Sequence, residues 1–221
     1  MIRSITRQKS QEEITALLSQ LDRIFIVGCG TCATLCRTGG AQEVEEMARR
    51  LREAGRLVTG SIVVPVACDE ISHEAMEQVS DQISQSQAVL ILACAFGVQT
   101  LGRQIQIPAI PALDTLFIGK ERGVGLFEEI CTQCGDCILG ETGGICPVTS
   151  CHKGLVNGPC GGTREGKCEI DPDKDCAWTV IYQRLKEQGR LDRMRKLHPP
   201  RNHQVSLSPG KIRIPVGERG D

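Results

Sequence analysis

The first half of the chain alternates continuous apolar runs with segments whose apolar residues recur at helical spacing. Short continuous runs bounded by glycine or polar residues are typical of strands buried on both faces of a parallel sheet. Such runs occur at 23–28 (RIFIVG), 61–67 (SIVVPVA), 88–93 (AVLILA) and 115–118 (TLFI). Helical spacing occurs at 10–21, 42–54, 72–83 and 98–105. This alternation predicts an α/β fold with a small open parallel sheet and right-handed crossovers.

Local signals refine several of these elements. Ser10 and Glu13 form the S-x-x-E capping box, which predicts that a helix begins after Ser10. Pro65 counts against the later half of the run at 61–67, because proline cannot donate a ladder hydrogen bond. The predicted inward-facing residues are Ile14, Leu17, Leu18 and Leu21 in the first helix, Val44, Met47, Ala48 and Leu51 in the second, and Ala75, Met76, Val79 and Ile83 in the third.

The pattern changes after residue 118, which predicts a division into domains. Residues 119–125 are charged and glycine-rich and are predicted to link the α/β domain (1–118) to a cysteine-rich domain (126–197). That second domain is predicted to be irregular and ferredoxin-like, closing with a helix that carries Trp178, Ile181 and Leu185 on one side and ends at Gly189. Residues 198–221 lack periodicity, so we expect an extended tail there.

Composition and charge restrict the function classes. The formal net charge is −1 and aromatic residues make up 3% of the chain, so neither a basic field nor a stacking platform for nucleic acid is expected. No apolar run approaches the ~20 residues of a membrane span. The N-terminus shows no apolar signal segment, and 13 cysteines without one are typical of metal ligands in a reducing cytoplasm.

The cysteine-rich stretch carries the main candidate chemistry. Its eight cysteines are Cys131, Cys134, Cys137, Cys146, Cys151, Cys160, Cys168 and Cys176. The opening C-x2-C-x2-C spacing is the one with which ferredoxin-type proteins place three thiolates around one iron–sulfur cluster. Eight thiolates match two [4Fe–4S] clusters, and the many glycines between them let the backbone approach the sulfides and supply N–H donors. Two [4Fe–4S] clusters are therefore predicted here.

The pairing of these cysteines, and the metal itself, stay open at this stage. Cys146-Pro147 has the dipeptide whose cysteine ligates the other cluster in bacterial ferredoxins, but it follows Cys137 at a longer interval than in those proteins. Structural zinc and disulfides are the alternatives. Trp178 is expected to cover a cluster and exclude water. His152 and Lys153 either add positive charge beside a cluster or are simply solvated surface residues.

A second metal site is predicted in the N-terminal domain. Cys29, Cys32 and Cys36 lie in the turn after the first predicted strand, Cys68 follows the second and Cys94 follows the third. Ligands bind at the carboxyl ends of strands in open α/β sheets. We expect Cys29, Cys32, Cys36 and Cys94 to bind a third [4Fe–4S] cluster or zinc, with Cys68 as a substitute ligand.

The same turn also allows a nucleotide interpretation. Gly28-Cys29-Gly30-Thr31-Cys32-Ala33 satisfies the G-x-G-x-x-A dinucleotide fingerprint after a strand. The acidic partner is expected about 20 residues further on, whereas Asp69 lies roughly twice as far along. The alternative prediction is a nucleotide-dependent reductase that uses this turn.

Several stretches resemble one known family. The run LVNGPCGGTREGKCEIDPDKDCAWTVIYQRL, together with CTQCGDC and FIVGCGTCATLC, resembles the small cysteine-rich iron–sulfur subunit (MetV type) of bacterial methylene-tetrahydrofolate reductases and the methylene-tetrahydrofolate reductase C-terminal domain family. The resemblance covers nearly the whole chain before the tail and is most specific at Gly158–Gly162 and Cys168-Glu169.

This resemblance implies a partner and a role. The partner would be a catalytic TIM-barrel subunit that binds FMN or FAD and reduces methylene- to methyl-tetrahydrofolate in one-carbon (acetyl-CoA pathway) metabolism. The present chain would pass electrons to that flavin, with a further electron-input subunit as an additional partner. No catalytic residues are expected in this chain. The alternative within the same complex is a zinc-binding scaffold.

Overall fold

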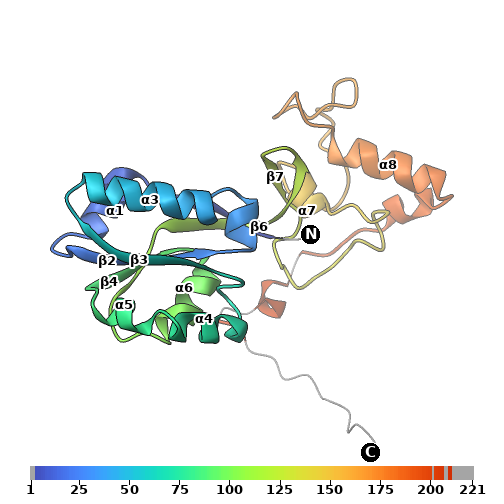
Figure 1. The fold of residues 1–221 in the computed structure, drawn as a ribbon. Coiled ribbons are helices and arrows are strands. Elements are labelled where there is room, and N and C mark those ends of the chain that lie inside the picture. The colour runs from blue at the N-terminus through green and yellow to red at the C-terminus, as the bar shows by residue number, and fades with distance from the viewer. Residues whose placement is uncertain (1–2, 201, 207–208, 211–221) are drawn as a thin grey trace, which may run out of the picture. The chain divides into compact units, whose positions relative to one another are not determined.

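The computed structural model describes residues 3–200, 202–206 and 209–210 of the chain. The chain divides into two compact units, with the boundary between Glu128 and Glu129. We call them the first unit and the second unit and describe each by itself (Figure 1).

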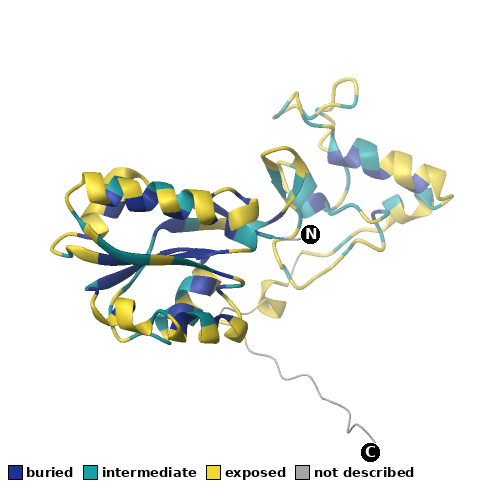
Figure 2. Cartoon of the chain, in the orientation of Figure 1, coloured by how far each residue is buried: buried dark blue, intermediate teal, exposed yellow. Residues whose placement is uncertain are grey.

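The first unit is built on a four-stranded parallel sheet with strand order β3-β2-β4-β5. Its strands are β2 (Arg23–Cys29), β3 (Leu57–Val64), β4 (Ala88–Leu92) and β5 (Ala109–Pro111). Every residue of β4, and every residue of β2 except Arg23, is buried (Figure 2). The strands predicted at 23–28 and 88–93 are confirmed, because a central strand covered on both faces needs a continuous apolar run.

The strand predicted at 61–67 exists with different bounds. β3 begins earlier, at Leu57, and ends at Val64, directly before Pro65. It lies at an edge of the sheet, and most of its residues are only partly buried. An edge strand therefore carries a weaker apolar signal than the two central strands, so the apolar run at 61–67 does not mark where β3 begins.

Helices lie on both faces of this sheet. The helices of the first unit are α1 (Gln11–Leu17), α2 (Cys32–Leu35), α3 (Ala41–Glu53), α4 (His73–Glu77), α5 (Ser80–Ser84) and α6 (Ala95–Gly102), and residues Glu70–Ser72 form one turn of 3₁₀ helix. Figure 1 shows α1 and α3 on one side of the sheet and α4, α5 and α6 on the other. This arrangement explains why the two central strands are apolar throughout.

The predicted features of α1 and α3 are largely confirmed. The Glu13 N–H donates to Ser10 Oγ at 3.2 Å and the Ser10 N–H donates to a Glu13 carboxylate oxygen at 3.0 Å, so the capping box is complete. Leu17 is 42% exposed, contrary to its predicted inward position, whereas the next residue, Leu18, is fully buried. The buried residues of α3 are the predicted Val44, Met47, Ala48 and Leu51.

The helix predicted at 72–83 is interrupted. The Val79 N–H bonds to the carbonyl oxygen of Met76, three residues earlier, at 3.3 Å. That tighter turn separates α4 from α5. Met76 and Ile83 are both buried as expected. The helix predicted at 98–105 begins earlier, at Ala95, with Cys94 as its N-cap.

The strand predicted at 115–118 does not join the parallel sheet. It belongs to β6 (Leu113–Gly123), which pairs antiparallel with β1 (Arg3–Gln8) and adjoins β7 (Leu126–Glu129) in a second sheet of order β1-β6-β7. The fourth parallel strand is instead β5. The predicted linker at 119–125 is thus the end of β6 and its turn into β7. The sequence did not predict β1, whose pairing with β6 is long-range.

The second unit has little regular structure. Its helices are α7 (Pro147–Ser150), α8 (Ala177–Glu187) and the 3₁₀ helices Leu191–Arg195 and His203–Val205. Trp178, Ile181 and Leu185 of α8 are buried together, as predicted. Gly189, at φ +67°, ends α8. Its N–H bonds to Lys186 O and the Arg190 N–H bonds to Leu185 O, which is the Schellman arrangement.

Two further expectations concern the ends and the membrane. The predicted tail at 198–221 is described only in part, and residues 201, 207–208 and 211–221 lie outside the described residues. Among the residues that the structure describes, no helix combines the length and the apolar character that a membrane span requires.

The buried centre of the parallel sheet provides a stability prediction. Leu90 in β4 is fully buried, whereas Leu57 at the start of β3 is 59% exposed. We expect Leu90→Ala to lower the free energy of unfolding by about 2–5 kcal/mol, since it removes core contacts and leaves a cavity. Leu57→Ala should change it by at most about 0.5 kcal/mol. Urea unfolding followed by far-UV circular dichroism measures both, and equal losses would contradict the core position of β4.

Candidate functional site

The cysteines of the protein fall into a group in each unit. No disulfide joins them in the part of the chain that the structure describes. The disulfide alternative therefore has no support in the structure, and the thiols are available as ligands.

Four thiols of the second unit lie around one pocket. This four-cysteine pocket is narrow and partly open to solvent. Its lining residues are Ser150, Cys151, Lys153, Cys160, Thr163, Cys168, Glu169, Cys176, Ala177 and Trp178. The cysteines span a long stretch of sequence, so only the folding of the loops between them brings them to one place.

Short helices and backbone bridges position these cysteines. Cys151 is the C-cap of α7 and Cys176 is the N-cap of α8. The Cys168 N–H bonds to Lys174 O at 2.9 Å, and the Cys176 N–H bonds to Gly166 O at 2.7 Å. These two bonds tie the loop that carries Cys168 to the start of α8, so both thiols reach the same pocket.

The start of α8 favours the thiolate form of Cys176. Burial alone would raise the pKa of this thiol. The net pKa is lowered, because hydrogen-bond donors stabilise the thiolate. These donors are the backbone N–H groups of Thr179 and Trp178 and the hydroxyls of Thr179 and Thr163. The free N–H groups at a helix N-terminus point toward an anion at this position. The thiolate is the form that binds metal.

Trp178, which the sequence predicts to cover a cluster, lines the four-cysteine pocket. Its side chain is 6% exposed and packs with Ile181 and Leu185. Its indole N–H donates to Leu155 O at 2.9 Å. The indole is therefore fixed in orientation and shields one wall of the pocket from water.

The basic residues beside the pocket are compensated by carboxylates. Lys153 forms an ion pair with Glu169, and His152 Nε2 lies 3.3 Å from an Asp171 carboxylate oxygen. The hydrogen bond to Glu169 is the main cause that raises the pKa of Lys153. Cys160 Sγ also lies 3.4 Å from Glu169 Oε1. Both basic side chains are exposed. They are therefore better described as solvated surface residues than as unpaired positive charges beside the pocket.

The other four cysteines of the second unit lie outside this pocket. Cys131 and Cys137 are exposed, while Cys134 and Cys146 are partly buried. The Gln133 N–H donates to Cys131 Sγ at 3.3 Å. Gln133 and Gly135 both have positive φ, +56° and +76°, a backbone conformation that occurs in turns whose N–H groups form anion-binding sites.

In the first unit, cysteines gather at one edge of the parallel sheet. Cys29 ends β2, Cys94 follows β4, and Cys68 lies in the turn after β3. Since β3, β2 and β4 are neighbours, these residues lie at adjacent strand ends, where ligands bind in such sheets. Cys32 opens α2 directly after the turn.

Cys68 and Cys36 differ in their surroundings. Burial raises the pKa of the Cys68 thiol, and the neighbouring thiols of Cys94, Cys29 and Cys32 raise it further. Burial also raises the pKa of Cys36, but of the other cysteines only Cys32 adds to that shift. Cys36 Sγ lies 3.9 Å from the Ser4 carbonyl oxygen on β1. The structure therefore brings Cys68 toward the other three thiols more clearly than Cys36.

Neither group of cysteines is preassembled as a metal site in the described part of the chain. Within residues 3–200, 202–206 and 209–210, no three His, Cys, Asp or Glu side chains are already arranged to share one metal ion. The donor set fits a thiophilic metal in kind. The cysteine side chains would have to turn toward it on binding.

The glycine-rich turn after β2 does not suit a dinucleotide. The Cys29 N–H bonds to Gly39 O and the Gly30 N–H bonds to Val64 O, at 2.9 and 2.8 Å. α2, which follows, has only four residues. A pyrophosphate needs free N–H groups at the start of a sustained helix, so this geometry disfavours the nucleotide interpretation.

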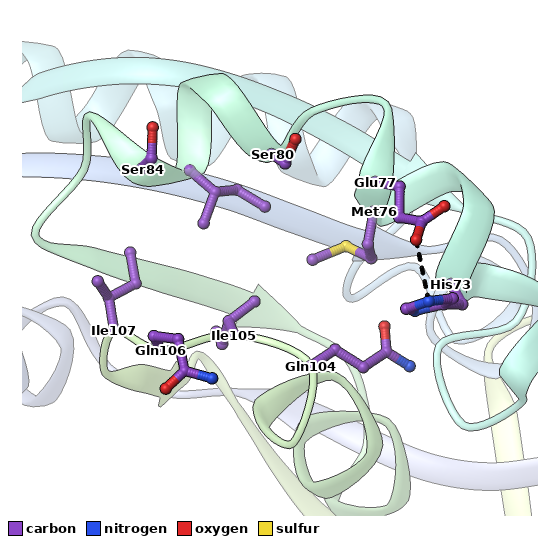
Figure 3. Close-up of a pocket in the computed structure, with 10 residues that line it drawn as sticks. His73, Met76, Glu77, Ser80, Ser84, Gln104, Ile105, Gln106 and Ile107 are labelled. Atoms are coloured by element: carbon purple, nitrogen blue, oxygen red, sulfur yellow. Dashed lines mark ion pairs between the residues drawn. The ribbon is translucent and has the colours of Figure 1, made fainter.

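A separate pocket of the first unit lies between α4, α5 and residues 104–107 (Figure 3). Met76, Ile83 and Ile105 give it an apolar interior. His73 and Glu77 form an ion pair at 3.2 Å on one side. None of its 10 lining residues is a cysteine, so this pocket contributes no ligand to the thiol groups.

Comparison with known families identifies the C-terminal part of the chain. Residues 110–204 match the model of a family described as "Methylene-tetrahydrofolate reductase C terminal". Comparison with curated proteins and with solved structures gives no match. The matched residues run from β5 through β6, β7 and the cysteine groups of the second unit. Residues 110–204 of this chain are therefore similar to the methylene-tetrahydrofolate reductase C-terminal family.

Proposed function

We propose that this chain is the iron–sulfur electron-transfer subunit of a methylene-tetrahydrofolate reductase complex. The family match supports the relation to that enzyme. The observation that carries the electron-transfer role is the group of eight cysteines in the second unit, four of them around one pocket. A further [4Fe–4S] cluster or zinc would lie at the sheet edge of the first unit, on Cys29, Cys32, Cys94 and one further cysteine.

The residues of the second unit fit such a role. Its apolar core consists of Trp178, Ile181 and Leu185, against which Cys151 and Cys176 pack. The thiols are thus part of the packing of the unit, and bound metal would hold together loops that the small core alone cannot order. Bound [4Fe–4S] clusters would accept and release one electron at a time.

The protein around the thiols would set the properties of the bound group. N–H groups donate to Cys131 and Cys160 sulfur, from Gln133 and Gly162. Such hydrogen bonds to sulfur, together with burial, raise or lower the reduction potential of a bound cluster. The reduction of the folate would take place on a flavin-bearing catalytic subunit, and this chain would deliver electrons to it.

Anaerobic purification of the whole chain tests this function. We expect a brown protein with about eight iron atoms and as many acid-labile sulfides for the second unit, since each [4Fe–4S] cluster takes four thiolates. After reduction with dithionite, the protein should bleach and then reduce the flavin of the catalytic subunit when the two are mixed. A colourless protein that contains zinc and no iron would replace this function with the zinc scaffold, because four thiolates also bind zinc.

A further inference from the structure

The position of Cys146 decides how the eight thiols of the second unit are shared. In bacterial ferredoxins, the cysteine of the Cys-Pro dipeptide ligates the other cluster, so the two ligand sets interleave along the chain. Cys146-Pro147 has that dipeptide. The sequence alone permits both an interleaved and a consecutive arrangement.

A buried threonine ties Cys146 to the first three cysteines. Thr142 is 2% exposed. Its hydroxyl oxygen lies 3.2 Å from the carbonyl oxygen of Ile138 and 2.6 Å from that of Ile145. Ile138 directly follows Cys137, and Ile145 directly precedes Cys146. One hydroxyl therefore holds the two ends of this loop near each other, with Cys137 at one end and Cys146 at the other.

The short helix α7 separates Cys146 from the remaining cysteines. Cys146 is its N-cap and Cys151 its C-cap. α7 has four residues, a rise of about 6 Å, and the two cysteines flank its opposite ends. The Thr149 hydroxyl donates to Ile130 O at 3.3 Å, which places α7 beside the residue that directly precedes Cys131. Cys151 lines the four-cysteine pocket, and Cys146 does not.

We propose that the two ligand sets are consecutive, with Cys131, Cys134, Cys137 and Cys146 binding one cluster and Cys151, Cys160, Cys168 and Cys176 binding the other. This inference rests on the proposed iron–sulfur function. The second set lines one pocket together with Trp178. Three of its thiols, Cys151, Cys168 and Cys176, are partly buried and Cys160 is exposed.

Paired alanine variants of the whole chain, purified anaerobically, distinguish the two arrangements. The deciding variant combines Cys131→Ala with Cys146→Ala. Consecutive sets predict that it loses one cluster and keeps about half of the iron and sulfide of the second unit. Interleaved sets predict that it loses both, because each cluster would lose one ligand. The control variant combines Cys131→Ala with Cys134→Ala, which removes two ligands of one set in either arrangement.

Spectroscopy provides a second readout that does not depend on activity. In the reduced Cys131→Ala, Cys146→Ala variant, we expect the electron paramagnetic resonance signal of one second-unit cluster, the same as in the control. Combining Cys146→Ala with Cys168→Ala should abolish the signals of both second-unit clusters. If the alanine variants do not fold, the same pairs as serine variants are compared, because serine keeps the size of the side chain.

Each outcome has a separate meaning. Loss of both second-unit clusters in the Cys131, Cys146 pair, with an intact single cluster in the control, overturns the consecutive sets and leaves the iron–sulfur function standing. Wild-type protein without iron instead overturns the function itself.

Discussion

Stripping metal from the protein should unfold the second unit while the first unit stays folded. Among the described residues of the second unit, the buried apolar cluster consists of Trp178, Ile181 and Leu185. At roughly 2 kcal/mol for each buried side chain, these residues supply far less than is needed, because ordering each residue of the loops costs about 1–2 kcal/mol. Metal binding to thiolates can contribute on the order of 10 kcal/mol or more per site. The first unit has a core of many fully buried aliphatic residues and needs no such support.

Limited proteolysis before and after anaerobic treatment with a chelator and an iron-oxidising agent measures this difference. We expect rapid cleavage within residues 129–200 of the stripped protein and survival of a fragment close to residues 3–128. The untreated protein, incubated with the same protease, is the control. Equal resistance of the second unit in both samples would show that its loops fold without metal and would remove this argument for ligand binding.

Replacing Cys68 should cost the first unit its metal, whereas replacing Cys36 should not. Cys68, Cys29 and Cys94 follow three neighbouring strands of the parallel sheet and therefore lie at one edge. Cys36 Sγ is instead directed toward the Ser4 carbonyl oxygen on β1. Loss of one of four thiolates leaves an incomplete tetrahedral site, which binds metal much more weakly.

The matched variants are Cys68→Ser and Cys36→Ser, each of which removes one thiol from the same unit. Total metal per chain, measured after anaerobic gel filtration, should fall by the content of one site in Cys68→Ser and stay at the wild-type value in Cys36→Ser. The reverse result would restore the ligand set that the spacing of the turn favours, Cys29, Cys32, Cys36 and Cys94.

Local sequence determined the elements whose signals are short-range. The capping box at Ser10 and Glu13 and the apolar stripe of α3 depend on contacts between residues three or four apart, and both were predictable. The central strands β2 and β4 were predictable because full burial requires continuous apolar runs. The eight-cysteine stretch was visible as a candidate metal-binding region for a similar reason, since its spacing is a property of the chain itself.

Only the tertiary structure decided features that depend on distant pairs. The segment 115–118 has an apolar run like that of a parallel strand, but its pairing with β1 joins residues more than a hundred positions apart and places it in another sheet. The sharing of the thiols is decided in the same way, because Cys151, Cys160, Cys168 and Cys176 meet only when the loops fold. Residue spacing shows which side chains can bind a metal, whereas the path of the backbone decides which of them come together.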